Sequence, residues 1–161
     1  MRRPAEKEAY DILDQLEIEY NLIEHEPIAS VKNYSIELPG PQVKNLLLKT
    51  KKNRQYFMLL LPEEKQVDLK LLATELGTKR LSFASPEELH DLLGLKPGEV
   101  TPIALAVDKE EKIQVVIDET VDRDDTIGFH PNVNTKTVIV RYRDFNRILD
   151  WINHPPLYKK C

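Results

Sequence analysis

Two apolar runs decide the fold: Val43–Lys49, which reads VKNLLLK, and Gln55–Leu61, which reads QYFMLLL. The short polar segment Thr50–Arg54 joins them. Two apolar runs linked by such a segment predict a β-hairpin. Because both runs are almost continuously apolar, they indicate strands that belong to a sheet covered on both faces.

Helical and strand patterns extend outward from this hairpin. Helices are predicted at Glu6–Leu16, Ser30–Leu38, Leu69–Leu76, Ser85–Gly94 and Asp144–Ile152. Further strands are predicted at Glu17–Glu24, Lys79–Phe83, Ile103–Val107, Lys112–Ile117 and Thr137–Val140. We expect Ile103–Val107 and Lys112–Ile117 to pair as another hairpin, and the residues after His154-Pro155-Pro156 to form a short tail. The pattern predicts an α+β fold, with a mixed, mostly antiparallel central sheet flanked by helices.

The clearest local signals lie at two helix ends. Ser85, followed by Pro86 and by Glu88 three residues on, forms the pattern of a capping box. Asp68 is a suitable N-cap for the helix that follows it, and Gly77 is a suitable C-terminal stop.

Length and composition indicate one soluble domain over residues 1–161, with 41% hydrophobic and 31% charged residues. No apolar run approaches the roughly 18 residues of a membrane helix, and the first residues lack the apolar core of a signal peptide. The net charge of −4 argues against a protein that coats nucleic acid by bulk attraction. The only cysteine, Cys161, has no intrachain partner, which excludes a disulfide framework and a cysteine-based metal site. We expect a cytoplasmic protein.

A polar stretch, Gly128–Thr135, separates two of the apolar strands. Pro131 cannot donate to a strand ladder and asparagines favour turns, so the stretch is predicted to be a loop. It contains His130, which titrates near neutrality, together with Asn132 and Asn134. On composition alone it is either a plain connection or a binding loop on a rigid sheet.

Other polar positions also allow two interpretations. Lys44, at the start of an apolar strand, either points to solvent or binds an anion, and Gly98–Pro102 forms another polar loop. Two basic segments are either ordinary exposed turns or phosphate contacts; their residues are Lys49, Lys51, Lys52 and Arg54, and Lys79 and Arg80. The sequence contains no motif for a nucleophile, a metal-dependent hydrolase or a phosphate-binding loop.

Four stretches in order resemble the signatures of one family: Lys44–Lys49, Lys79–Ala84, Gly98–Pro102 and Phe129–Thr135. The family is the YbaK-like editing domain associated with prolyl-tRNA synthetase, and the similarity is to its free-standing branch that deacylates alanyl-tRNA(Pro). It covers the chain from about the first helix to about Val140. The sequence departs from the pattern at Leu47, Asn132 and Lys136, where the branch usually has Phe, Leu and Ala, and before Lys44, where the segment is short.

The resemblance implies an enzyme that hydrolyses the ester between a wrong amino acid and the tRNA 3′ end. It uses no metal, no cofactor and no covalent intermediate, and the ribose 2′-hydroxyl helps to activate the attacking water. Lys44 and Asn45 would then hold the terminal nucleotide, and Gly98 would offer backbone groups to the ester or the amino group. The implied partners are the acceptor end of tRNA(Pro) and prolyl-tRNA synthetase, with no DNA and no membrane.

By the same resemblance, His130 lines the amino-acid pocket, with Ile28 and Phe129 as apolar neighbours. Thr101, Pro102 and Asn134 are the remaining expected substrate contacts. The expected tRNA contacts are the basic residues Lys49, Lys51, Lys52, Arg54, Lys79 and Arg80. His130 is either a pocket wall or a general base, and we favour the wall because substrate assistance replaces a protein base.

Editing meets a physical need, since a pocket built for proline rejects alanine by only about 1–3 kcal/mol per missing methylene. A second pocket that is too small for proline completes the discrimination. Two alternatives remain open. One is a deacylase for Cys- or Ser-tRNA, because the sequence does not fix the pocket volume. The other is a non-catalytic tRNA-binding module of the same fold.

Overall fold

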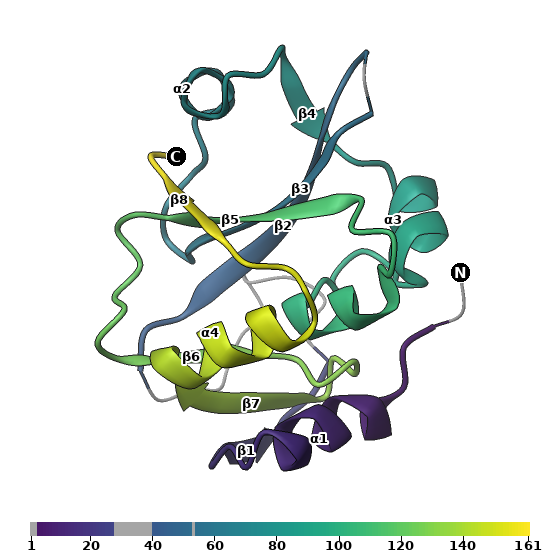
Figure 1. Ribbon diagram of the computed structural model, residues 1–161, viewed down its shortest axis with the longest axis vertical. Coiled ribbons are helices and arrows are strands. Elements are labelled where there is room, and N and C mark those ends of the chain that lie inside the picture. The colour runs from purple at the N-terminus through teal and green to yellow at the C-terminus, as the bar shows by residue number, and fades with distance from the viewer. Residues whose placement is uncertain (1–2, 28–39, 53) are drawn as a thin grey trace.

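The structure is a computed structural model that describes residues 3–27, 40–52 and 54–161 (Figure 1). Its elements in chain order are α1 (Glu6–Gln15), β1 (Asn21–Glu24), β2 (Val43–Thr50), β3 (Tyr56–Pro62), α2 (Leu69–Leu76), β4 (Leu81–Phe83), α3 (Pro86–Leu93), η2 (Pro102–Val107), β5 (Ile113–Asp118), β6 (Thr126–Phe129), β7 (Lys136–Arg141), α4 (Tyr142–Trp151) and β8 (Leu157–Lys159). None of the described helices is long and apolar enough to cross a membrane. The helix predicted at Ser30–Leu38 and the predicted site residue Ile28 lie outside the described residues.

In the described part of the chain the strands form two sheets. One has three strands in the order β1-β7-β6, all antiparallel; the other has five in the order β4-β2-β3-β5-β8. The hairpin expected around the polar segment Thr50–Arg54 is present as β2 and β3, with Leu46 opposite Leu59. β4 is antiparallel to β2, whereas β5 and β8 continue the sheet in parallel. The predicted α+β fold is confirmed.

The five-stranded sheet is covered on both faces, as its continuous apolarity predicts. Side chains of one face, including Leu47 and Met58, join a core that lies between the two sheets and also contains residues of α1, α3, η2 and α4. Side chains of the other face, including Leu48 and Leu59, form a second core under α2. In Figure 1, α2 lies beside β4 and the C-terminal end, and α4 lies against β6 and β7.

The two helix-end predictions are confirmed. Asp68 Oδ1 accepts a hydrogen bond from Leu71 N at 3.0 Å, and Gly77 ends the helix with φ 67°. At α3, Ser85 Oγ accepts from Glu88 N at 3.1 Å and Glu88 Oε1 accepts from Ser85 N at 3.0 Å. Polar side chains thus satisfy the free amides at the start of both helices.

The hairpin predicted between residues 103–107 and 112–117 is wrong. Pro102–Val107 forms a 3-10 helix, and β5 pairs with β3 in parallel, with Val115 opposite Met58. Pro102 presets the backbone angle of a helical first turn. Ile103, Ala104 and Leu105 are all buried, and an apolar run without a period does not distinguish a buried strand from a buried helix.

Two further predictions need correction. The expected C-terminal tail instead forms β8, and Cys161 is buried, with its carbonyl oxygen accepting from Asp68 N at 2.7 Å. The strand expected from Glu17 begins only at Asn21. Glu17 has a left-handed backbone with φ 54°, in the turn that ends α1.

Candidate active site

The three polar stretches singled out in the sequence meet in the structure. Asn45, near the start of β2, donates from Nδ2 to Val100 O at 3.4 Å. Thr101, in the same loop as Val100, donates from Oγ1 to His130 O at 2.6 Å. Thr101 is fully buried, so this hydrogen bond is shielded from water. The loop at residues 98–101 therefore links β2 to the segment that follows β6.

The conformation of the 98–101 loop depends on Gly98. Its φ is +86°, a left-handed value that a glycine adopts without steric cost. On either side of it, Glu99 N donates to Lys96 O at 3.0 Å and Lys96 N donates to Glu99 Oε1 at 2.9 Å. Pro102 is buried and starts η2, which fixes where the loop ends. The backbone groups of Val100 and Thr101 are thereby held beside Asn45.

His130 is half-buried with a defined orientation. Its Nδ1 lies 3.0 Å from Lys136 O, and because a carbonyl oxygen can only accept, Nδ1 is the donor. Burial lowers the pKa of His130 below the usual 6.5, although the hydrogen bond to Lys136 O acts in the opposite direction. His130 is therefore neutral at pH 7, with its lone pair on Nε2.

A second histidine, His25, lies beside His130. The ring centroids are 6.0 Å apart in an edge-on arrangement. His25 Nδ1 lies 2.8 Å from Glu26 O, and Nε2 lies 2.7 Å from Thr137 Oγ1 on β7. Sequence reasoning missed His25, because its only local signal is a position just after a strand. Its neighbours come from the pairing of β1 with β7, with Glu24 opposite Lys136.

Two buried amide oxygens near these loops have no partner. Among the described residues, Asn45 Oδ1 and Asn132 Oδ1 accept no hydrogen bond. An unsatisfied buried acceptor costs about 1–3 kcal/mol. Asn45 Oδ1 lies at the junction of β2 and the 98–101 loop, where a donor from a bound molecule would satisfy it.

Residues 25–148 match the family model described as the aminoacyl-tRNA editing domain. The chain belongs to this family. The prediction of an aminoacyl-tRNA editing enzyme is thereby confirmed.

Relatives support the same assignment. The editing domain is 35% identical over 140 residues to the prolyl-tRNA editing protein ProX of Acetoanaerobium sticklandii, covering 85% of each chain. It is 30% identical over 144 residues to the multifunctional Ser/Thr-tRNA deacylase ProXp-y of Escherichia coli K12, covering 85% of this chain and 83% of that one. The crystal structure of hypothetical protein APE2540 superposes with a TM-score of 0.72 at 15% identity, over 94% of this chain and 98% of that one, and so shares the fold.

Lys44 and Asn45 leave β2 of the editing domain in opposite directions. Val43 and Leu47 pack in the core between the sheets, whereas Leu46 packs in the core under α2. Side chains alternate along a strand, so Asn45 faces the 98–101 loop and Lys44 faces the other side. Lys44 is half-buried and forms no ion pair or hydrogen bond with the described residues. Its role at the terminal nucleotide, and with it a part in catalysis, stays a prediction.

The other predicted substrate contacts of the editing domain differ in exposure. Phe129 belongs to β6, is 3% exposed, and packs its ring against Phe145 with the centroids 5.9 Å apart. It therefore supports the loop from within the core. Asn134 is half-buried in the turn before β7. His130 is the side chain of this segment with a ring nitrogen left for a ligand.

The basic residues of the editing domain divide into two groups. Lys49 forms an ion pair with Glu88 at 2.5 Å, and Tyr56 Oη donates to the same carboxylate at 3.0 Å. Burial alone raises the pKa of Glu88, but the hydrogen bonds from Lys49, Ser85 and Tyr56 outweigh it and lower the pKa to about 2. The charge of Lys49 is therefore already matched within the protein.

The other basic side chains that were predicted to contact tRNA are exposed and gather at one end of the five-stranded sheet. We call this group the basic tip; it consists of Lys51, Lys52, Arg54, Lys79 and Arg80. β2 and β4 pair with Thr50 opposite Leu81, which brings the two basic turns side by side. Thr50 lies five positions after Asn45 along β2, a distance of about 17 Å at roughly 3.3 Å per residue.

A groove of about 600 Å³ adjoins the basic tip at Arg54. It is also lined by Tyr56, Lys112, Gln114 and Pro155. Tyr56 pairs with Lys49, at the end of the sheet far from Asn45, so this groove is separate from the candidate active site. In the described part of the chain, no three His, Cys, Asp or Glu side chains come together as a metal site.

Proposed function

We propose that this protein is a trans-editing deacylase that hydrolyses the ester of mischarged tRNA(Pro), with Ala-tRNA(Pro) as its preferred substrate. The observation that carries the proposal is the meeting of Asn45, the 98–101 loop and His130 through direct hydrogen bonds. The names of the two relatives, a prolyl-tRNA editing protein and a Ser/Thr-tRNA deacylase, support this class of reaction.

In the proposed reaction, a water oxygen attacks the ester carbonyl carbon and the carbonyl oxygen takes the negative charge. The intermediate then collapses: the bond from the carbonyl carbon to the ribose oxygen breaks, and a proton from the water reaches the leaving oxygen by way of the neighbouring ribose hydroxyl. The backbone N–H groups of Val100 and Thr101 donate to none of the described residues. Fixed amides of this kind stabilise an oxyanion without reorganising during the reaction.

Asn45 has a matching role on the substrate side. Its Nδ2 is occupied by Val100 O, which leaves Oδ1 as a buried acceptor without a partner among the described residues. A ribose hydroxyl or the amino group of the amino acid is a donor of the right kind. In the free enzyme this unsatisfied acceptor is destabilising, and a hydrogen bond from the substrate would remove that cost. The removed cost would add to the free energy of substrate binding.

We assign His130 to the pocket wall. Its Nδ1 is held by Lys136 O, which fixes the ring plane and leaves only Nε2 toward a ligand. Burial lowers the pKa of His130, which makes it a weaker base than a free imidazole. A fixed ring limits the size of the amino acid that enters, which is what a sieve against proline requires.

The cationic side chains would hold the RNA. The side chain of Lys44, which has no partner among the described residues, leaves β2 on the face opposite to Asn45 and would pair with a phosphate of the terminal nucleotide from that side. The basic tip is about 17 Å further along β2, at roughly 3.3 Å per residue, and would contact the acceptor stem of tRNA(Pro). Phosphate contacts of this kind orient the RNA without reading its sequence. Prolyl-tRNA synthetase is the partner that would supply the mischarged tRNA.

Ser-tRNA is a second candidate substrate. The relative from Escherichia coli is named a Ser/Thr-tRNA deacylase and is 30% identical to this chain. The open acceptor Asn45 Oδ1 also fits the hydroxyl of serine. A methyl group and a hydroxymethyl group differ by one oxygen, and a small polar pocket admits both.

The test is a deacylation assay with Ala-, Ser-, Cys- and Pro-tRNA(Pro). We expect Ala-tRNA(Pro) to be hydrolysed fastest and Pro-tRNA(Pro) to be spared. Lys44→Ala should fold normally and lose most of the activity, whereas Lys109→Ala, an exposed lysine in the turn before β5, should keep it. Faster hydrolysis of Ser-tRNA(Pro) would favour the second candidate. Tight tRNA binding with no hydrolysis of any substrate would make the protein a binding module.

A further inference from the structure

The segment Arg3–Glu6, which we call the strap, contacts both loops of the candidate site. Arg3 Nη1 and Nη2 donate to Glu99 Oε1 and Oε2, each at 2.7 Å, in a two-point ion pair. Arg3 Nη2 also lies 3.4 Å from Asn132 O. One guanidinium thus joins the 98–101 loop to the loop that contains His130, and its planar fork fixes the geometry of that junction.

Two more contacts tie the strap to the His130 loop. Asn132, buried with φ 63°, donates from Nδ2 to Ala5 O at 2.9 Å. Lys136 Nζ forms an ion pair with Glu6 Oε2 at 2.6 Å. The strap itself is held because it leads into α1, whose Ala9 and Leu13 are fully buried in the core.

The residues that the strap contacts are neighbours of the site residues. Glu99 precedes Val100 and Thr101, Asn132 lies two residues after His130, and Lys136 supplies the carbonyl oxygen that orients the His130 ring. None of the strap contacts involves Asn45, Thr101 or the His130 ring. The strap therefore acts on the position of the loops and leaves their reactive groups free.

Charge links the strap to His130 as well. The titratable groups that act on the pKa of His130 are His25, which lowers it, and Glu99, which raises it. The hydrogen bonds from Arg3 are the main cause of the lowered pKa of Glu99. The positive charge of Arg3 thus compensates the negative charge of the ionised Glu99 carboxylate. The Lys136–Glu6 pair on the other side of the strap balances its own charge.

We propose that Arg3 is a positioning residue for the editing reaction, which sets the spacing between the 98–101 loop and the His130 loop, and with it the size of the amino acid that is accepted. The proposal rests on the proposed function. A displacement of about 1 Å in a site of this kind can reduce the rate by about a hundredfold. Among the described residues, the strap holds the 98–101 loop through the Arg3–Glu99 ion pair and the His130 loop through three contacts, one of them from Arg3. The loss of Arg3 therefore allows such a displacement without removing any core side chain.

The experiment compares Arg3→Ala with Glu99→Gln. Both variants break the ion pair, and we expect each to lower kcat for Ala-tRNA(Pro) about tenfold, with a small change in KM. The ratio of the hydrolysis rate of Ala-tRNA(Pro) to that of Pro-tRNA(Pro) should also fall. Arg3→Lys should restore part of kcat. The matched control is Lys7→Ala, which breaks an exposed ion pair with Asp11 on α1 and should change neither quantity.

A second readout does not depend on activity. The pKa of His130, followed by NMR, should rise in Arg3→Ala, because the Glu99 charge is no longer neutralised, and should fall in Glu99→Gln, because that charge is gone. A merely structural role would shift both variants in the same direction or not at all. Wild-type kcat and substrate ratio in both variants would overturn the proposal, and so would an unchanged His130 pKa. If the wild type hydrolyses no aminoacyl-tRNA, the proposed function fails, and the NMR titration alone decides the role of the strap.

Discussion

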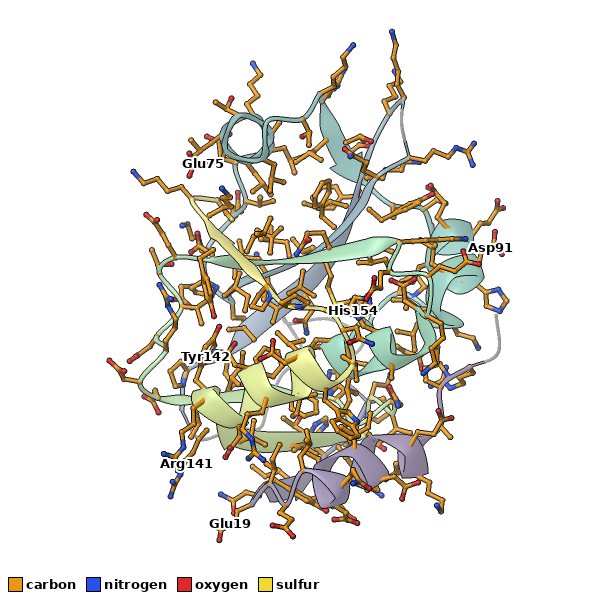
Figure 2. The ribbon with its side chains drawn as sticks, in the orientation of Figure 1. Glu19, Glu75, Asp91, Arg141, Tyr142 and His154 are labelled. Carbon is orange, nitrogen blue, oxygen red and sulfur yellow. The ribbon has the colours of Figure 1, made fainter. Side chains whose placement is uncertain are left out.

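In one region of the molecule the buried polar side chains have hydrogen-bond partners for all their polar atoms, whereas in another some buried acceptors have no partner among the described residues. Asp108, at the end of η2, accepts from His154 Nε2 at 2.9 Å, Ile113 N at 2.9 Å and Lys112 N at 3.1 Å. His154 also has Ile152 O at 2.6 Å from Nδ1, so both ring nitrogens face acceptors. In the view of Figure 2, His154 lies inside the molecule between β5 and α4.

A second carboxylate of the five-stranded sheet follows the same pattern. Asp118, fully buried at the end of β5, accepts two hydrogen bonds from Lys65 Nζ at 3.0 and 2.9 Å, one from Cys161 N at 3.1 Å, and one from Thr120 Oγ1. At the candidate site, by contrast, Asn45 Oδ1 and Asn132 Oδ1 lack partners among the described residues. A third such atom, Thr78 Oγ1 in the turn after α2, has no explanation in the structure.

The difference separates two uses of buried polarity. Asp108 and Asp118 fasten segments that are distant in sequence, and every acceptor that they bring into the core is used. Asn45 is half-buried, and its Oδ1 atom is buried without a partner among the described residues. The paired carboxylates therefore mark where the fold is held together, and the open acceptor of Asn45 marks where a ligand is expected. Substitutions in each region test this division.

The largest effect should come from breaking the Asp108–His154 pair. Asp108→Ala leaves the buried His154 ring and the amides of Lys112 and Ile113 without their carboxylate, and we expect a loss of about 3–5 kcal/mol in the free energy of unfolding. Urea denaturation measures it, with the exposed Glu110→Ala as the matched control. Activity per folded molecule should be unchanged. A loss of stability below about 1 kcal/mol, as for an exposed ion pair, would mean that the Asp108–His154 pair does not hold the fold together.

The same pair predicts a dependence of stability on pH. Burial alone lowers the pKa of His154, but hydrogen bonds to Asp108 and Ile152 O outweigh it, so the pKa lies above 6.5. This contribution to stability is fully present below pH 6.5 and is lost as the pH rises through the folded-state pKa. For Asp108, burial alone raises the pKa, but the hydrogen bonds outweigh it and lower the pKa below 3.8, so its contribution is lost only as the pH falls through that lower value.

Comparison of wild type with His154→Gln between pH 4 and pH 9 tests this directly. The difference in unfolding free energy should be greatest below pH 6.5 and should shrink at higher pH. A difference that grows toward alkaline pH would mean that His154 is buried in its neutral form.

Asn45→Ala should give the opposite result to Asp108→Ala. The substitution removes an unsatisfied acceptor together with the long Asn45 Nδ2–Val100 O hydrogen bond, and because these two effects oppose each other we expect stability to change by less than about 1 kcal/mol. Deacylation of Ala-tRNA(Pro) should fall by at least about tenfold, equivalent to about 1.4 kcal/mol. Thermal unfolding and single-turnover kinetics on the same preparation measure both quantities. A large loss of stability with normal turnover would make Asn45 a structural residue.

His130→Ala should change selectivity more than rate. Removing the ring enlarges the pocket, so hydrolysis of Pro-tRNA(Pro) should gain on that of Ala-tRNA(Pro) by about tenfold, the scale set by a methylene. The exposed His90→Ala is the matched control. Because burial lowers the pKa of His130, wild-type activity should stay level as the pH falls to 6.5. Complete loss of hydrolysis for every substrate, with an acid limb assignable to His130, would make it the general base.

The smallest effect should come from the basic tip. Replacing Lys51 and Lys52 with Ala should weaken tRNA binding a few-fold and flatten its salt dependence, by about 0.7–0.9 in log–log slope for each phosphate that the protein no longer neutralises. Selectivity among amino acids should not change. The same substitution at Lys49 should instead destabilise the protein slightly, because Lys49 is paired with Glu88. An unchanged salt dependence would mean that the basic tip does not contact tRNA and is ordinary exposed surface.

Local patterns predicted the parts of the fold that depend on neighbours in sequence. The β2–β3 hairpin and the ends of α2 and α3 were predictable, since Asp68, Gly77 and Ser85 act within one turn of their own positions. The parallel pairing of β5 with β3 and with β8 was not, because the sequence of a strand does not state the direction of its partner.

The candidate site divides in the same way. Asn45, the 98–101 loop and His130 were recognisable as polar residues in a resembling pattern, and the structure brings them together. Arg3, His25 and Glu99 were not recognisable. Their partners lie about a hundred residues away, as in the Arg3–Glu99 and His25–Thr137 contacts. Asn132 and Lys136, two departures from the family pattern, both contact the strap.

The pairing of β1 with β7 has a consequence for folding kinetics. Asn21 lies opposite Ile139, and this pairing closes one of the longest loops in the chain. Pairings of high sequence separation form slowly, because the chain must lose its freedom before the contact stabilises it. The contacts of His25 with Thr137 and with the His130 ring depend on this step. Catalytic competence should therefore be acquired late in refolding, after the β2–β3 hairpin and its helices have formed, and recovery of deacylation should lag behind recovery of secondary structure.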